Sequence, residues 1–127
     1  MSDSLKIVSS FQFSQGSLNM LREAAQADVL CVADTNELLA HLHEAEILCS
    51  YKVTRKWRKL APQLRWLQAA GAGVDELRPT GILDADSGVI VTTAVGIHAT
   101  TLSEYAFGSM LMFNRDRKST RLTPVTL

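Results

Sequence analysis

The stretch GVIVTTAVGIHATTLSEYAFGSMLMFN, residues 88–114, decides the fold together with LRWLQAAGAGVD, residues 64–75. Each stretch begins with an apolar run rich in β-forming residues and then reaches a turn of small residues. The stretch at residues 88–114 continues from its turn into a segment with helical composition. A strand that passes through a short turn into a helix is the repeating unit of a parallel α/β sheet.

The rest of the chain shows the same alternation of short apolar runs and helical segments. We expect strands at residues 5–9, 28–33, 46–50, 64–69 and 89–93. We expect helices over residues 17–27, around 38–42 with Asp34 or Thr35 as the cap, over 54–60, and over 99–113. We expect residues 77–87 to form a loop before the last strand, with at most one helical turn in it.

This order predicts an α/β fold with a flavodoxin-like, doubly wound parallel sheet of about five strands in three α/β/α layers. Because parallel strands need right-handed crossovers, few topologies remain, and we favour the strand order 2-1-3-4-5. The Rossmann order is the alternative, and the sequence alone does not separate the two.

The composition excludes several classes of protein. The chain has 127 residues, of which 46% are hydrophobic and 20% charged, and its 13 basic residues balance its 13 acidic residues. Such a balance gives no electrostatic footprint for nucleic acid or for an anionic membrane surface. No apolar run is long enough to span a bilayer, and residues 1–8 (MSDSLKIV) do not form a secretory signal. With Cys31 and Cys49 interpreted as free thiols, we expect a cytoplasmic location.

The turn AGAGVD, residues 70–75, follows an apolar strand and holds two glycines. It is not a GxGxxG motif, because Glu76 occupies the position of the third glycine. One interpretation is simply a tight turn from a strand into a helix. The other is a carboxylate-binding turn in which the backbone amides of Ala72, Gly73 and Val74 donate the hydrogen bonds.

The second turn, GIHATT at residues 96–101, leads into a helix. Thr100 or Thr101 can cap that helix, and Glu104 stands three residues after Thr101, which is the spacing of a capping box. This spacing explains Glu104 without a catalytic role. His98 lies in the mouth of the turn, and we interpret it as a hydrogen-bonding residue rather than a catalyst; no metal site is predicted.

The two turns, in this order and with this spacing, resemble the N-terminal substrate-binding (catalytic) domain of the D-isomer-specific 2-hydroxyacid dehydrogenases. The resemblance covers roughly residues 5–114. It implies an oxidoreductase that transfers hydride between NAD or NADP and the CH-OH or C=O group of a small 2-hydroxy or 2-oxo acid. The domain would occupy residues 1–114, and the substrate would lie in a cleft beside the two turns.

The resemblance also implies roles for individual residues. Ala72, Gly73, Val74 and His98 would bind the substrate, and Lys52, in the loop after the third strand, would face it. Ala72, Thr100 and Leu102 would lie near the cofactor. The helix over residues 99–113 would pack in a homodimer.

The sequence departs from that family in its C-terminal part. The dinucleotide motif and the catalytic Arg, Glu and His of the family belong to a second domain, and none can be placed here. We therefore expect a chain that is truncated before the NAD-binding domain, is inactive alone, and binds no cofactor tightly. Residues 115–127 (RDRKSTRLTPVTL) are off pattern and predict a disordered tail.

Two interpretations from other classes stay open. A stand-alone flavodoxin-like binding or regulatory module would perform no catalysis, and an assembly subunit would use only the apolar helix. A receiver-type module would need acidic residues after the first strand and an Asp at the end of the third. The chain has Ser9, Ser10 and Ser50 at those positions, which disfavours a receiver.

Overall fold

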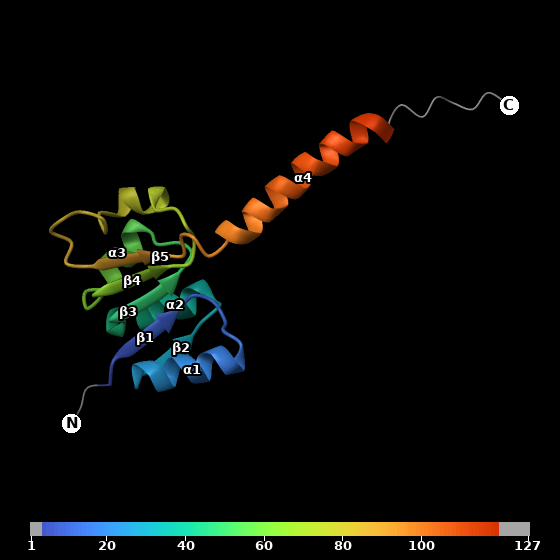
Figure 1. Ribbon diagram of the computed structural model, residues 1–127. Helices are drawn as coiled ribbons and strands as arrows, with labels where there is room; N and C mark the ends of the chain where they lie inside the picture. The colour runs from blue at the N-terminus through green and yellow to red at the C-terminus, as the bar shows by residue number, and fades with distance from the viewer. Residues whose placement is uncertain (1–3, 120–127) are drawn as a thin grey trace. The chain divides into compact units, whose positions relative to one another are not determined.

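The computed structural model describes residues 4–119 in two units, of which the first ends at Val95 and the second begins at Gly96. The first unit is built on a parallel sheet (Figure 1). Its strands are β1 (Lys6–Ser9), β2 (Asp28–Cys31), β3 (Ile47–Ser50), β4 (Trp66–Ala69) and β5 (Ile90–Thr93). They lie in the order β2-β1-β3-β4-β5, and every neighbouring pair is parallel. The predicted α/β fold and strand order are confirmed, and the Rossmann order is wrong for this chain.

Short helices connect the strands, and polar side chains fix where they begin. The α-helices of this unit are α1 (Gln15–Ala25), α2 (Thr35–His41) and α3 (Arg55–Leu60), and the 3-10 helices are η1 (Leu42–Glu44) and η2 (Asp75–Thr80). Asp34 caps α2, because its carboxylate accepts from the amides of Asn36 and Glu37 at 2.9 and 3.0 Å. α1 begins earlier than predicted because Ser14 caps it.

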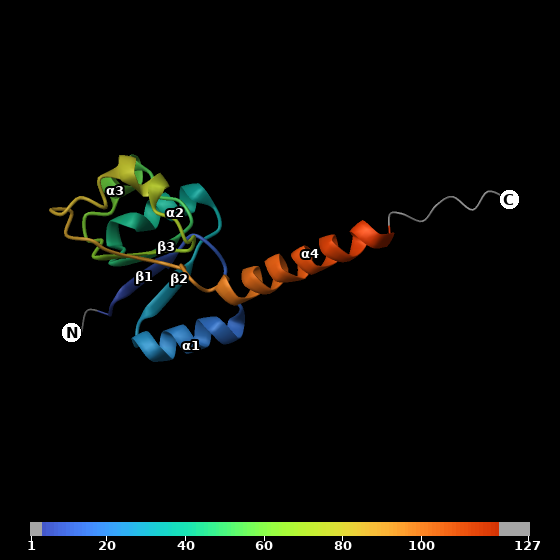
Figure 2. The same cartoon turned by 45° about the horizontal axis from the view of Figure 1, so that its top comes forward.

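Helices cover both faces of the sheet, as Figure 2 shows with α1 on one side and α2 and α3 on the other. The larger core lies under α2, α3 and η2, where Leu38, Leu48 and Leu67 are almost completely buried. The smaller core lies under α1, where Ile7 and Val29 pack against Leu21. Burial on both faces is what a doubly wound sheet requires.

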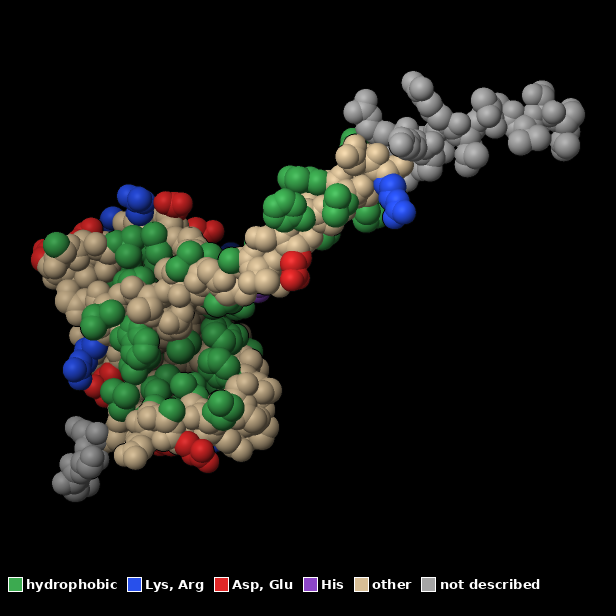
Figure 3. Space-filling model, in the orientation of Figure 1, with side chains coloured by type: hydrophobic (Ala, Val, Ile, Leu, Met, Phe, Trp, Pro, Cys, Tyr) green, Lys and Arg blue, Asp and Glu red, His purple; other side chains and the backbone are tan. Residues whose placement is uncertain are grey.

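The α1 face is covered over only part of its width. Where α1 does not reach, the side chains of Trp66 and Ile90 on β4 and β5 stay 39% and 67% exposed. Figure 3 shows apolar side chains over this region of the first unit. The Trp66 indole Nε1 donates to Thr92 Oγ1 at 2.7 Å, and Thr92 Oγ1 donates to Gln68 Oε1 at 2.6 Å. These bonds hold the exposed face in a defined arrangement.

The two cysteines lie on either side of β1. Cys31 and Cys49 both pair in register with Ser9, so two strand spacings, about 10 Å, separate their backbones. This separation is too large for a disulfide, and both thiols are free, as expected. Burial, together with the neighbouring Cys31, raises the pKa of the Cys49 thiol.

The second unit contains the helix α4 (Ala99–Ser119). Gly96 adopts the left-handed conformation (φ 88°), and the amide of Ala99 donates to its carbonyl at 3.1 Å. The helix therefore begins before Thr100 and Thr101. Both lie in its first turn, so the predicted cap at these residues and the capping box with Glu104 are wrong.

α4 also runs further than predicted. Residues 115–119 are helical rather than part of a disordered tail, and residues 120–127 lie outside the described residues. Arg115 favours helix formation. Within residues 4–119, no helix is both long enough and apolar enough to cross a bilayer.

Candidate functional site

A cleft of about 480 Å³ opens at the carboxyl ends of β3 and β4 in the first unit. Its walls are formed by the loop after β3, the end of β4 with its glycine turn, and η2: Tyr51 and Lys52, then Ala69, Gly71 and Gly73, then Asp75, Glu76 and Leu77. Open parallel sheets bind their ligands at this edge, and the volume suits a small molecule. The fold therefore places the glycine turn and the Lys52 loop at one site.

The glycine turn is anchored on both sides by backbone hydrogen bonds. The amide of Ala70 donates to the carbonyl of Ser50 at 3.0 Å, and the carbonyl of Gly71 accepts from the amide of Ala94 at 3.0 Å. Among residues 4–119, the amides of Ala72, Gly73 and Val74 donate no hydrogen bond to a protein acceptor. These three amides are therefore available to a ligand, and a row of free amides suits an anion.

Gly73 leaves an open path to these amides. Its φ is not positive, and an added Cβ would meet no atom within 4 Å. The fold therefore does not need glycine at this position, and a larger side chain would fill space beside the cleft rather than collide with the core.

Ser50 shapes the loop that carries Lys52. Its hydroxyl donates to the carbonyl of Lys52 at 2.6 Å and accepts from the amide of Lys52 at 3.2 Å. This turn at the end of β3 positions Lys52, whose exposed side chain lines the cleft. Lys52 is the cationic residue of the cleft lining.

The structure brings some of the predicted site residues together. Lys52 and Gly73 line one cleft, with Ala72 and Val74 adjacent to Gly73 in the chain. His98, Thr100 and Leu102 belong to the second unit, where Leu102 donates its amide to the carbonyl of His98 at 2.9 Å. Their predicted roles in substrate and cofactor binding stay predictions.

Six lining residues were not among the predicted site residues, and the three of them with an aromatic or charged side chain are Tyr51, Asp75 and Glu76. Each is next to a predicted feature, since Tyr51 precedes Lys52 and the two acids follow the glycine turn. This closeness in the sequence to Lys52 and to the glycine turn could have indicated that they belong to the site. What the sequence did not show is that the loop after β3 and the start of η2 face the same space.

The first unit does not fit the pyrophosphate of a dinucleotide. Such a site needs a glycine-rich turn that leads into the N-terminus of an α-helix. Here the turn leads into η2, a 3-10 helix of six residues whose first turn holds Asp75 and Glu76. These carboxylates would repel a pyrophosphate. The glycine turn therefore lacks the features of a pyrophosphate site.

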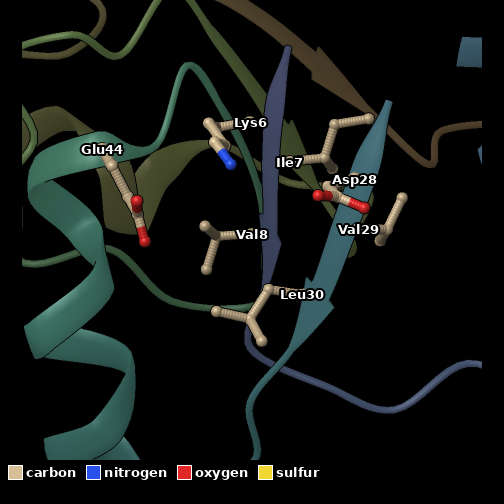
Figure 4. A pocket seen from close by; sticks show the side chains of 7 residues that line it. All are labelled: Lys6, Ile7, Val8, Asp28, Val29, Leu30 and Glu44. Atoms are coloured by element: carbon tan, nitrogen blue, oxygen red, sulfur yellow. The ribbon is translucent and has the colours of Figure 1, made fainter. Parts of the chain in front are cut away.

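A second hollow lies at the opposite, amino edge of the sheet (Figure 4). It is lined by Lys6 and Asp28, the first residues of β1 and β2, and by Glu44 of η1. The Glu44 carboxylate is 2.9 Å from His41 Nδ1, and this bond with the nearby positive charges holds the pKa of Glu44 below its usual value. Each of the two hollows is lined by one cation and two carboxylates, so their charge does not distinguish them. We place the site at the carboxyl edge, because open parallel sheets bind their ligands there.

No protein-family model and no curated protein sequence matches the chain. The solved structures that are similar to it include two dehydrogenases. One is a 3-phosphoglycerate dehydrogenase of Entamoeba histolytica with NAD+ bound, with a TM-score of 0.63, 18% sequence identity, and coverage of 84% of this chain and 38% of that chain. The other is a D-isomer specific 2-hydroxyacid dehydrogenase family protein of Aeromonas salmonicida subsp. salmonicida A449. Its TM-score is 0.60 at 23% sequence identity, and the match covers 98% of this chain and 42% of that chain.

Both similar structures are dehydrogenases, so the resemblance predicted from the two turns is confirmed at the level of the fold. The chain spans about two fifths of the length of each.

Proposed function

We propose that this chain supplies the substrate-binding part of an NAD(P)-dependent oxidoreductase that acts on small 2-hydroxy and 2-oxo acids. The observation that carries the proposal is the cleft at the carboxyl edge, which is lined by Gly73 and by the cation of Lys52, with the unbonded amides of Ala72 and Val74 on either side of Gly73 in the chain. The similarity in fold to two dehydrogenases supports it. A cytoplasmic location remains part of this proposal.

The chemical role of the chain is to hold the acid. The amides at the glycine turn and the Lys52 ammonium neutralise the carboxylate of the substrate, which leaves the adjacent carbonyl in a fixed orientation. The bound nicotinamide would supply the hydride, and the pyrophosphate of that cofactor needs residues other than those of the first unit. The catalytic acid–base group that hydride transfer requires is not assigned to any residue of this chain.

The proposal is tested by calorimetric titration of the 127-residue chain with pyruvate. We expect weak but saturable binding, in the millimolar range that a few hydrogen bonds and one charge support. Lys52→Gln should weaken binding by about tenfold, which corresponds to ~1.4 kcal/mol for one charge-assisted contact. The control Lys59→Gln, on α3 and outside the cleft lining, should leave the affinity unchanged. Absence of saturable binding would remove the proposed function.

The same preparation should not oxidise NADH when a 2-oxo acid is added. The cleft would bind the 2-oxo acid, but no dinucleotide site and no proton donor for hydride transfer are assigned to this chain. The measurement is the absorbance of NADH at 340 nm with a panel of 2-oxo acids, and calorimetry with NAD should show no micromolar affinity. Turnover clearly above the blank would contradict this account of the chain.

The helix α4 is proposed as a homodimer contact. Its large apolar side chains surround much of its circumference, and they are Leu102, Tyr105, Phe107, Met110, Leu111, Met112 and Phe113. These are too many for one face of a helix, so the helix needs cover on more than one side.

We therefore expect the chain to elute as a dimer or larger species at micromolar concentration, measured by size-exclusion chromatography with light scattering. Replacing Met110 and Leu111 together by Gln should shift the population toward the monomer, whereas Ser103→Gln on the same helix should not. A wild-type chain that is a monomer throughout the micromolar range would contradict the proposed dimer.

A further inference from the structure

An aromatic wall stands beside the cationic side of the cleft. The Tyr51 side chain lines the cleft and is 65% exposed, and its ring centroid lies 5.3 Å from that of Phe11. Phe11 in turn packs edge-on against Phe13 at 5.0 Å. Aromatic side chains of this kind present a large apolar surface to a ligand at little cost in conformational entropy.

Hydrogen bonds between two loops support this wall. Ser10, after β1, donates its hydroxyl to Ser50 Oγ at 2.9 Å, and Ser50 holds the turn that carries Tyr51. The loop after β1 that carries Phe11 is held by Ser9, whose hydroxyl donates to the carbonyl of Phe11 at 2.8 Å. Tyr51 is therefore backed by an ordered neighbour, and its ring offers a fixed surface.

The η2 part of the cleft lining carries negative charge. Asp75 and Glu76 both line it, and Arg78, which pairs with Asp75 at 3.2 Å, is not part of the lining. Lys52 is the single cation of that lining. Once the Lys52 ammonium and the turn amides hold one carboxylate, no positive side chain of the cleft remains for a second anionic group. A second anion would lie near the Glu76 carboxylate, which is unfavourable.

From these contacts we infer that the cleft selects 2-oxo acids with an uncharged, aromatic-sized side chain and discriminates against those with a second anionic group. Tyr51, backed by Phe11, provides the surface for that side chain, and Glu76 provides the repulsion. The inference rests on the proposed function, since it concerns the same cleft. It distinguishes this chain from the similar Entamoeba histolytica protein, which by name acts on a phosphorylated acid.

The test compares three 2-oxo acids by calorimetric titration of the 127-residue chain: pyruvate, phenylpyruvate and 3-phosphohydroxypyruvate. We expect phenylpyruvate to bind about tenfold more tightly than pyruvate, which is the size of effect that one aromatic contact with its buried area supports. We expect the phosphorylated acid to bind no more tightly than pyruvate.

Matched variants assign the selectivity to the two walls. Tyr51→Ala should abolish the preference for phenylpyruvate and change pyruvate binding by less than about twofold, while the control Tyr105→Ala on α4 should change neither. Glu76→Gln should tighten binding of the phosphorylated acid severalfold more than it tightens binding of pyruvate, because the phosphorylated acid carries the additional negative charge. These readouts are relative affinities, so a general loss of folding would not imitate them.

Each outcome separates this inference from the proposed function. If pyruvate binds but phenylpyruvate binds no more tightly, or if the phosphorylated acid binds most tightly, the selectivity is wrong and the proposed function stands. If Tyr51→Ala weakens pyruvate and phenylpyruvate equally, the aromatic wall is not the selective element. If none of the three acids binds, the proposed function fails, and the selectivity fails with it.

Discussion

Replacing Leu67 by alanine is expected to lower the free energy of unfolding by about 2–5 kcal/mol. Leu67 lies on the central part of the sheet in β4, its side chain is 0% exposed, and it belongs to the larger core under α2 and α3. Removing its branched end leaves a cavity that rigid neighbouring strands cannot close. In a domain of this size, such a loss lowers the melting temperature by roughly 10 °C or more, measured by circular dichroism.

The matched control is Ile90→Ala on the neighbouring strand β5. Ile90 lies on the incompletely covered face and is 67% exposed, so its truncation should cost less than about 1 kcal/mol. Equal losses for the two variants would contradict the assignment of the two faces, because both positions would then be buried in solution.

Gly73→Val is expected to weaken pyruvate binding strongly, by at least tenfold, and to leave the melting temperature nearly unchanged. The branched side chain would occupy the space through which a carboxylate reaches the amides of residues 72–74. The fold should tolerate it, since Gly73 has no positive φ and an added Cβ meets no atom within 4 Å. Melting temperature and Kd are measured on the same preparation.

Gly16→Val is the control for the Gly73 variant. Gly16 lies in the first turn of α1, and an added Cβ there also meets no atom within 4 Å. This control should leave both the affinity and the melting temperature close to those of the wild type. A folded Gly73→Val chain with unchanged affinity would remove the glycine turn from the site, while a large loss of stability would show that the turn is a structural feature of the fold.

The order of the strands could be predicted because the signals that carry it are local. Each strand is a short apolar run, and the helix starts at Ser14, Asp34 and Thr54 are set by side chains that bond to amides two or three residues away. The parallel arrangement then follows from the alternation of strands and helices. The limits of individual elements differed from prediction by a few residues because strand ends depend on pairing between distant segments.

The start of α4 at residue 99 was predicted correctly, but its capping residues were predicted wrongly for a specific reason. Thr100 and Thr101 are good capping residues, but the left-handed turn at Gly96 lets the helix begin at Ala99, before either of them. A backbone conformation selected at one glycine thus overrode the capping preference of two side chains. The sequence does not reveal which of these two local signals prevails.

The cleft itself could be predicted only in part. Gly73 was predicted from its glycine turn and Lys52 from the family resemblance, and the fold places both at the same edge. The aromatic support of Tyr51 could not be predicted, because Phe11 and Tyr51 are forty residues apart and meet only through the pairing of β1 with β3. The same reason applies to Glu76, whose position opposite the Lys52 loop depends on the path of the chain after β4.

The most direct test of the central claim is a map of where a small 2-oxo acid binds, obtained from ¹H–¹⁵N spectra of the 127-residue chain during titration with pyruvate. We expect saturable shifts concentrated at Lys52 and at the amides of residues 71–74, with the amino-edge hollow around Lys6 and Glu44 unaffected. Shifts confined to the amino-edge hollow or to the exposed face around Trp66 and Ile90, or no saturable shift at all, would contradict it.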